Sequence, residues 1–304
     1  MQGRVRTRDI PLNWDVLVTP GIPTVTSDLP PGATQQMWSP ISSTLICGER
    51  DAVLVDAPIT VEQARAVVDW VVASGKKLTT IYVTHGHGDH FFGAGALLER
   101  FPNARAVARP DVVKFMRQQA SPDVLANFWS ARFPGQIPDR LVIADELAGN
   151  VIDLEGHDLV VVEVGHTDTE YTTVLHVPSV GLVVAGDVAY NDVHLWLGES
   201  NAQTRREWIS ALDTIESLNP RAVIAGHKRP GSDDSPKIIE ETRQYIRDFD
   251  RIVETTTTAR ELYDKMLELY PDRAGQSGAS AVAFGPRGQT VIHMTKKGEL
   301  ICVQ

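Results

Sequence analysis

Residues 78–92 read LTTIYVTHGHGDHFF, an apolar segment that runs directly into three histidines and an aspartate. The part before the first histidine is rich in β-branched and aromatic side chains, which is typical of a buried strand. Residues 91–100 read as the start of a helix. The polar side chains therefore lie on a strand-to-helix loop, where open α/β sheets place their functional sites. They are His85, His87, Asp89 and His90.

Metal binding is the chemistry that this cluster favours. Imidazole nitrogens and carboxylate oxygens without thiolates suit zinc, iron or manganese. Three later apolar segments repeat the pattern, because each runs into a glycine followed by a metal-ligating residue: His166, Asp187 and His227. Asp168, two residues after His166, is expected to cap the next turn or to orient the His166 ring.

This ordered set of residues resembles the metallo-β-lactamase superfamily of hydrolases over roughly residues 40 to 230. The resemblance implies two divalent metal ions, zinc first, with iron or manganese as alternatives. It implies that one ion is held by His85, His87 and His166, and the second by Asp89, His90 and His227, with Asp187 bridging the two. A hydroxide between the ions would be the nucleophile, because metals lower the pKa of bound water.

The chain divides into three parts on composition and periodicity. Residues 1–40 are rich in Pro and Gly and read as an N-terminal arm with one or two strands, and residues 41–235 as the catalytic domain. Residues 236–304 read as a C-terminal helical region, broken near residues 255–258, and a tail packed on the same domain. Each half of the catalytic domain repeats strands and helices, which predicts an α/β fold of two facing mixed sheets with outer helices. This αββα sandwich is also the fold that the resemblance implies.

Local patterns place several elements. Residues 42–47 and 52–56 read as a hairpin, and residues 60–73 as a helix that starts with a capping residue. Residues 204–207 read as a capping box that opens a second helix.

An aromatic insertion at residues 110–140 is expected to form one or two short helices over the site. It would supply a hydrophobic wall for an apolar substrate, together with a loop that follows Tyr190. The candidate substrate contacts are Phe115, Phe128, Trp129, His194 and Trp196.

The predicted reaction is hydrolysis of a carbonyl ester or lactone of a hydrophobic small molecule. Tyr190, three residues after Asp187, resembles the tyrosine of the N-acyl homoserine lactonase branch, which helps to bind the carbonyl oxygen. Asp89 is the candidate for accepting or relaying a proton. Asp89 and Tyr190 are therefore the candidate catalytic residues.

Several other functions remain open. β-Lactam hydrolysis and thioester hydrolysis of the glyoxalase II type use related sites, and the latter binds glutathione through C-terminal basic residues; here Arg243, Arg247 and Arg251 read as a solvated face. Persulfide dioxygenases use one iron, for which His85, His166 and Asp187 would be the ligands. A metal-stabilised scaffold protein is the non-enzymatic alternative.

Composition narrows the partners. The net charge of −10 argues against a nucleic-acid substrate, because phosphate binding depends on Lys and Arg. We expect no membrane partner, because no apolar run reaches the length of a membrane span; the first nine residues lack the apolar core of a secretory signal, so we expect a cytoplasmic enzyme. Two cysteines are too few for a disulfide framework. An apolar stripe of Leu262, Met266 and Leu269 is either core or the surface of a homodimer.

Overall fold

A computed structural model describes residues 11–26, 29, 34–275, 293–294 and 300–301. The predicted tail from residue 276 onward therefore lies outside the described residues, apart from the short strands β14 (His293–Met294) and β15 (Leu300–Ile301). None of the described helices is long and apolar enough to cross a membrane.

One mixed sheet of eleven described strands organises the chain, in the order β8-β7-β6-β5-β4-β13-β12-β11-β10-β9, with β1 paired to β4. The strands of the first half are β1 (Asn13–Thr19), β4 (Ile41–Cys47), β5 (Asp51–Val55), β6 (Lys77–Tyr82), β7 (Arg105–Ala108) and β8 (Asp145–Glu146). Those of the second half are β9 (Val151–Leu154), β10 (His157–Gly165), β11 (Thr172–Val177), β12 (Leu182–Asn191) and β13 (Ala222–Lys228). Two short strands, β2 (Pro23–Thr24) and β3 (Gln36–Met37), pair outside this sheet.

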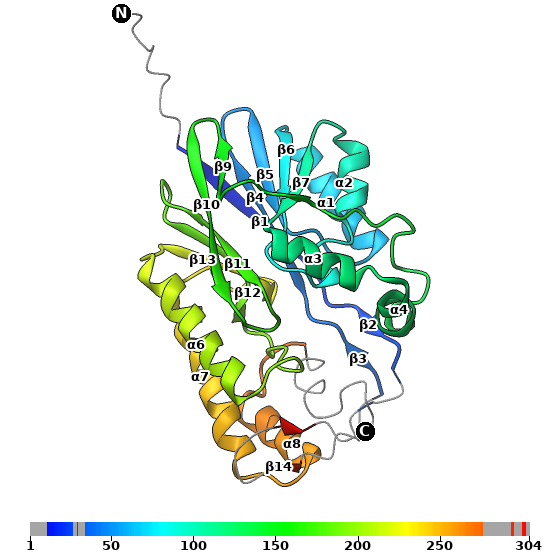
Figure 1. The fold of residues 1–304 in the computed structure, drawn as a ribbon, viewed down its shortest axis with the longest axis vertical. Helices are drawn as coiled ribbons and strands as arrows, with labels where there is room; N and C mark the ends of the chain where they lie inside the picture. Colours follow the sequence, from blue (N-terminus) through cyan, green and yellow to red (C-terminus); the bar gives the residue numbers. More distant parts are fainter. Residues whose placement is uncertain (1–10, 27–28, 30–33, 276–292, 295–299, 302–304) are drawn as a thin grey trace, which may run out of the picture.

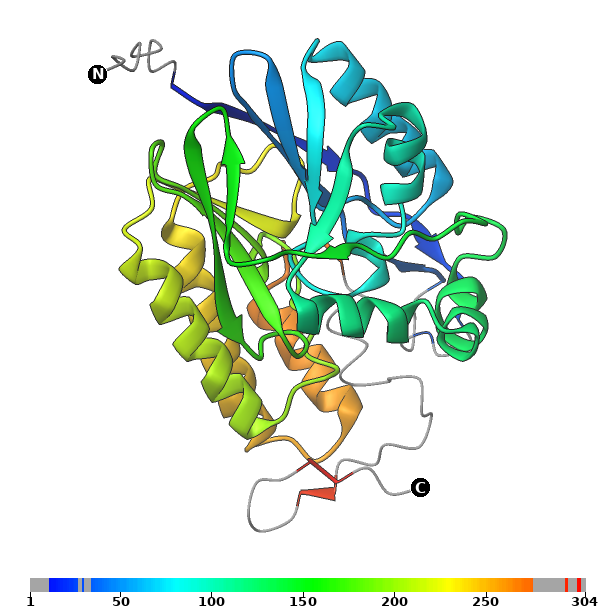
Figure 2. The ribbon, with the colours of Figure 1, turned by 45° about the horizontal axis from the view of Figure 1, so that its top comes forward.

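Helices cover both outer faces of the curled sheet, as Figures 1 and 2 show. The first half carries α1 (Val61–Ala73) and α2 (Ala94–Arg100), and the second carries α6 (Ala202–Ser217) and α7 (Lys237–Val253). The 110–140 segment forms α3 (Pro110–Gln119), α4 (Pro122–Val124), the π-helical turn η2 (Leu125–Trp129) and α5 (Ser130–Arg132). The remaining helices are the single turn η1 (Gly88–His90) and α8 (Ala259–Leu269).

Three buried clusters show the layers of the fold. One packs α1 and α2 onto the first half of the sheet, a second packs α6 and α7 onto the second half, and a third lies between the halves. The third cluster joins Val53 and Tyr82 to Leu175 and Ile224, so the two halves face each other. Burial of both faces explains why β4 and β12 are buried along their whole length. The predicted α/β sandwich with outer helices is confirmed.

The two predicted sheets are hydrogen-bonded into a single curled sheet. One residue pair, His227 with Ile41, registers β13 against β4 at the junction. The segment predicted as an arm also joins this sheet, since β1 pairs with β4 in seven residue pairs.

Local predictions are confirmed for the first hairpin, for α1 with its Thr60 and Gln63 capping box, and for the break between α7 and α8. The predicted start of α6 is wrong by a few residues. The helix begins at Ala202, because the Asn201 side chain accepts hydrogen bonds from the backbone N–H groups of Gln203 and Thr204.

Candidate metal centre

Buried histidines and aspartates from both halves of the sheet meet in one cluster. Two groups have ligand atoms that lie within 4.8 Å of one another around the loop after β6: His85, His90 and Asp187 form one, and Asp89, His90 and His227 form the other. The loop after β6 therefore meets β12 and β13 as predicted. A third group consists of His85, His87 and Asp168.

Asp187 lies between the histidines of the two halves. Its Oδ1 is 3.4 Å from His90 Nε2, and its Oδ2 is 3.2 Å from His227 Nε2. Asp89 Oδ2 lies 3.5 Å from the same His227 nitrogen. Ligand atoms around a tetrahedral metal with bonds near 2.1 Å are about 3.4 Å apart, so these spacings suit a metal-bound carboxylate with each oxygen on a different side.

Several of these atoms are buried without a hydrogen bond. Among the described residues, His85 Nε2, His90 Nε2 and Asp187 Oδ1 have no hydrogen-bond partner, and their side chains are buried. Buried polar atoms are nearly always satisfied in folded proteins, and exceptions mark functional groups or ion sites. The residues present therefore fit a bound cation.

Supporting contacts fix which nitrogen each histidine presents. Asp56 Oδ2 lies 3.0 Å from His90 Nδ1, and the Pro40 carbonyl oxygen lies 2.9 Å from His227 Nδ1. Such contacts hold the ring so that Nε2 faces the cluster. Asp56 itself accepts hydrogen bonds from the backbone N–H and the hydroxyl of Thr84, at 2.9 and 2.8 Å.

Glycines before the candidate ligands Asp187 and His227 allow the close approach of the neighbouring strands β12 and β13. Gly186 has a φ of +52°, a region that glycine enters at little cost. A Cβ atom at Gly226 would lie 2.2 Å from Asp187 Oδ1. Both glycines lie inside β12 and β13 and not at strand ends as predicted, whereas Gly165, which ends β10 with a φ of +84°, fits the prediction.

Opposite charges hold the cluster in its ionised form. Burial alone would raise the pKa of Asp89 and Asp187, but the neighbouring His90 and His227 lower both well below the usual range. Burial would likewise lower the pKa of His90, but Asp187, Asp89 and Asp56 raise it to about 9. The carboxylates are therefore available as anionic ligands.

His166 is not brought into the cluster. Its side chain is half-buried, its Nδ1 lies 3.0 Å from the Thr167 carbonyl oxygen, and no candidate metal group among the described residues contains it. Asp168 lies beside His85 and His87 instead. A register shift between Glu163 and Gly165 precedes this loop. Such bulges redirect side chains, and the sequence pattern does not reveal them.

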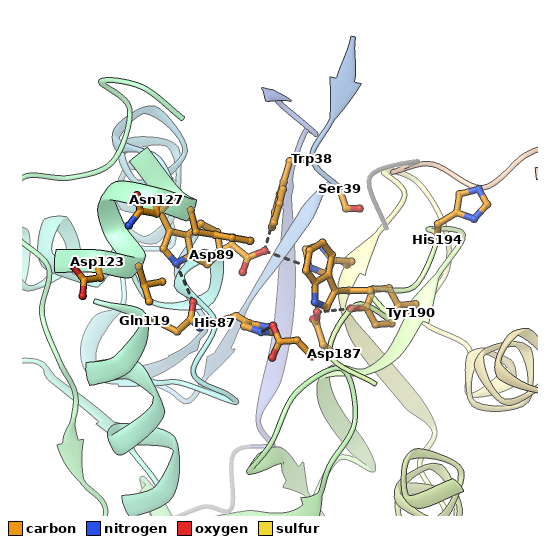
Figure 3. Close-up of a pocket in the computed structure, with 16 residues that line it drawn as sticks. Trp38, Ser39, His87, Asp89, Gln119, Asp123, Asn127, Asp187, Tyr190 and His194 are labelled. Atoms are coloured by element: carbon orange, nitrogen blue, oxygen red, sulfur yellow. Dashed lines mark hydrogen bonds and ion pairs between the residues drawn. The ribbon is translucent and has the colours of Figure 1, made fainter. Parts of the chain in front are cut away.

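A cavity of about 450 Å³ adjoins the cluster. Figure 3 shows His87, Asp89 and Asp187 at its centre, with Trp38 above them and Asn127 and Asp123 from the 110–140 segment at one side. Its aromatic lining consists of Trp38, Phe128, Trp129, Tyr190, His194 and Trp196. The predicted residues Phe128, Trp129, His194 and Trp196 therefore lie at the cavity.

Two predicted substrate contacts have other surroundings. Phe115 is not among the lining residues; its ring packs 5.8 Å from the His87 ring and closes the space over Gly86. His194 is 1% exposed, its Nδ1 lies 3.0 Å from the Tyr245 hydroxyl, and Figure 3 shows its ring pointing away from Asp89.

Tyr190 contacts the cluster through its hydroxyl group. The hydroxyl donates a hydrogen bond of 2.6 Å to Asp187 Oδ2. Burial and the Asp187 charge raise the pKa of Tyr190 well above its usual value, so the phenol keeps its proton. The contact with a substrate carbonyl stays a prediction.

Three site residues escaped the sequence analysis. Trp38 Nε1 donates a 2.8 Å hydrogen bond to Asp89 Oδ2, and Glu199 Oε1 lies 3.0 Å from His87 Nε2. Trp38 belongs to no pattern that would reveal it, whereas Glu199 lies on the loop after Tyr190 that is predicted to border the pocket. Asp56 does belong to a pattern, because it directly follows the buried strand β5, as the predicted ligands follow theirs.

Comparison with known proteins agrees with this geometry. The sequence model of the Metallo-beta-lactamase superfamily matches residues 37–227. A curated relative, "Metallo-beta-lactamase type 2" of Bacteroides fragilis, is 22% identical over 213 residues, which cover 69% of this chain and 76% of the relative.

Solved structures show the same fold at low sequence identity. A metallo-beta-lactamase family protein from Thermus thermophilus aligns with a TM-score of 0.59 and 19% identity, over 90% of this chain and 94% of that protein. A beta-lactamase domain protein from Burkholderia ambifaria aligns with a TM-score of 0.59 and 20% identity, over 95% and 90% of the two chains.

Proposed function

The chain belongs to the metallo-β-lactamase superfamily, and we propose that, as a metal-dependent hydrolase, it cleaves the carbonyl ester or lactone bond of an uncharged hydrophobic molecule. The observation that carries this proposal is the cavity beside the metal cluster. Five large aromatic side chains line it, and its charged lining consists of acidic residues and histidines, with no lysine or arginine among the described residues.

The charge of the cavity supports an uncharged substrate. Asp123 and Glu199 line it in addition to the cluster carboxylates Asp89 and Asp187. Apart from the metal ions, whose charge the cluster carboxylates offset, a carboxylate on the substrate would find no lysine or arginine in this lining, and desolvating an unpaired charge is unfavourable. The aromatic rings favour an apolar acyl or alkyl group.

The site residues have separate roles in this proposal. When bound, divalent ions lower the pKa of water and polarise the carbonyl oxygen. Asp187 presents one oxygen to each half of the site, and Tyr190 fixes the Oδ2 atom through its 2.6 Å hydrogen bond. Asp89 borders the cavity and is oriented by Trp38, so it is our candidate for accepting the proton of the attacking water.

β-Lactam hydrolysis is the second candidate, because the curated relative bears the name of a metallo-β-lactamase. β-Lactam antibiotics carry a carboxylate near the scissile amide, which the acidic lining disfavours.

The other two chemistries have less support from the described residues. The prediction that Arg243 belongs to a solvated face is wrong: it is buried, pairs with Asp213 and Glu216 between α6 and α7, and is not among the cavity residues that could bind glutathione. The iron ligands of a persulfide dioxygenase would include His166, which no candidate metal group contains.

The test is a panel of matched substrates on protein of measured metal content. It pairs a neutral aromatic ester with its carboxylated analogue and a lactone with the corresponding lactam; a β-lactam, a thioester and a persulfide complete it. We expect metal-dependent cleavage of the neutral ester or lactone, with kcat/KM at least about tenfold above the carboxylated analogue, equivalent to about 1.4 kcal/mol.

The variant Asp187→Asn is the matched control. It keeps the shape of the side chain but weakens both metal contacts, so we expect it to lose nearly all activity. Faster turnover of the β-lactam than of any ester or lactone, or oxygen uptake with the persulfide by an iron-loaded chain, would refute the ester and lactone assignment.

A further inference from the structure

We infer that Asp168 completes the metal site of His85 and His87, and that His166 takes no part in it. This inference rests on the proposed metal-dependent function. It replaces an imidazole by a carboxylate at one position of the predicted set of ligands.

The position of Asp168 carries the inference. Its side chain is 0% exposed, and its Oδ2 lies 2.9 Å from His87 Nδ1 and 3.6 Å from His85 Nε2. The three residues offer ligand atoms that all lie within 4.8 Å of one another. They are thus close enough to share one ion after small side-chain adjustments.

Unsatisfied atoms point into this group. His85 Nε2 is buried without a hydrogen bond, and the buried Asp168 Oδ2 has His87 Nδ1, at 2.9 Å, as an ion-pair partner. A carboxylate and a bare imidazole nitrogen that face each other in a dry interior are costly unless a cation offsets their lone pairs, and a metal ion between them would do so.

The loop orients the carboxylate through its other oxygen. Thr167 donates a 2.8 Å hydrogen bond to Asp168 Oδ1, and the same hydroxyl contacts Thr172 Oγ1 at 2.8 Å. Oδ1 is therefore occupied, and Oδ2 faces the histidines. The expectation that Asp168 orients the His166 ring is not what the contacts show, because Asp168 is bound to Thr167 instead.

His166 lies differently. Its Nδ1 faces the carbonyl oxygen of the next residue, its side chain is half-buried, and it is absent from the cavity lining. The set of ligands then holds three carboxylates, Asp89, Asp168 and Asp187, which offset more of the charge of two divalent ions than two carboxylates would.

Two matched variants of the full chain test the inference: Asp168→Asn and His166→Asn. Zinc equivalents per chain are measured by elemental mass spectrometry after dialysis in zinc buffers, and affinities by titration calorimetry. We expect Asp168→Asn to weaken one zinc site by more than about a hundredfold, because the loss of an outer contact alone costs about 10–100-fold. We expect His166→Asn to bind zinc like the unchanged chain.

Three outcomes overturn the inference: zinc loss in His166→Asn alone, zinc loss in both variants, or zinc loss in neither. Circular dichroism shows whether Asp168→Asn folds; if it does not, full zinc binding by His166→Asn supports the inference and a deficit overturns it. An unchanged chain that binds no zinc or other metal would overturn the proposed function as well. Zinc loss in His166→Asn alone would overturn this inference but would not overturn the proposed function.

Discussion

At the residue scale, the candidate metal ligands are each held by a second contact, which decides which of their atoms faces the cluster. Asp56 holds His90, the Pro40 carbonyl holds His227, and the Trp38 indole holds Asp89. These contacts hold the ligands near their working positions, which reduces the cost of ordering them when an ion binds.

His194 supplies a prediction about pH. Burial, reinforced by the nearby Arg273 charge, lowers its pKa to about 4. Because an unfolded histidine has a pKa near 6.5, the unfolded chain binds this proton more readily. The stability that His194 contributes is therefore complete above pH of about 6.5 and falls as the pH drops toward 4. We expect acidification from pH 7 to pH 5 to lower the free energy of unfolding by about 2 kcal/mol through protonation of His194.

The measurement compares the chain with His194→Gln by urea unfolding at both pH values, with chelator present so that metal binding does not contribute. The variant should lose less stability than the unchanged chain on acidification. Equal pH dependence in the two proteins would contradict the assignment.

At the element scale, helix termini depend on single capping side chains. The start of α6 shows the competition between neighbouring signals: Thr204 was the predicted cap, but Asn201 accepts two backbone hydrogen bonds, and Thr204 contacts the Asn201 N–H in return. The helix therefore begins earlier than the threonine alone suggested.

Replacing Asn201 by alanine should lower the free energy of unfolding by about 1 kcal/mol, because two backbone N–H groups lose their acceptor. Thr204→Ala is the matched control and should cost less than Asn201→Ala, since its hydroxyl accepts only the Asn201 N–H. Urea unfolding of both variants gives the comparison. A larger loss of unfolding free energy in Thr204→Ala would show that Thr204, and not Asn201, is the main cap of α6.

At the scale of the whole molecule, the candidate site joins two halves. His85 and His90 come from the first half, and Asp187 and His227 from the second; a single registered pair links β13 to β4 nearby. The predicted homodimer stays a prediction: Leu262 and Met266 of its apolar stripe are buried in the chain itself, while Leu269 is 44% exposed.

Because bound metal would bridge the two halves, its removal should destabilise the entire fold. A ligand that binds only the folded chain stabilises it by about 2.7 kcal/mol per site when the free ligand concentration is about one hundred times the Kd. We expect a chelator to lower the Tm and added zinc to restore it, as measured by calorimetry.

Asp187→Asn should show a much smaller response to the same treatment, because both halves lose a ligand. If the chelator removes the metal and the Tm does not change, the ions do not stabilise the contact between the halves.

The sequence by itself determined the features that depend on local signals. Strand composition followed by glycine and a candidate ligand singled out Asp187 and His227, which lie in the same cluster as His85 and His90 of the HxHxDH loop, because strands and turns are set by nearby residues. Their role as metal ligands stays a prediction. Periodicity likewise predicted α1 and the break before α8.

Only the tertiary structure decided which neighbours meet across long stretches of chain. The sequence favoured His166, yet the loop after β10 turns Asp168 toward His87, and Trp38 reaches Asp89 from 51 residues away. Phe115 could not be separated from Phe128 by composition, although one backs His87 and the other lines the cavity. Side-chain direction after a bulge and contacts between distant segments depend on packing of the whole fold, which no local pattern encodes.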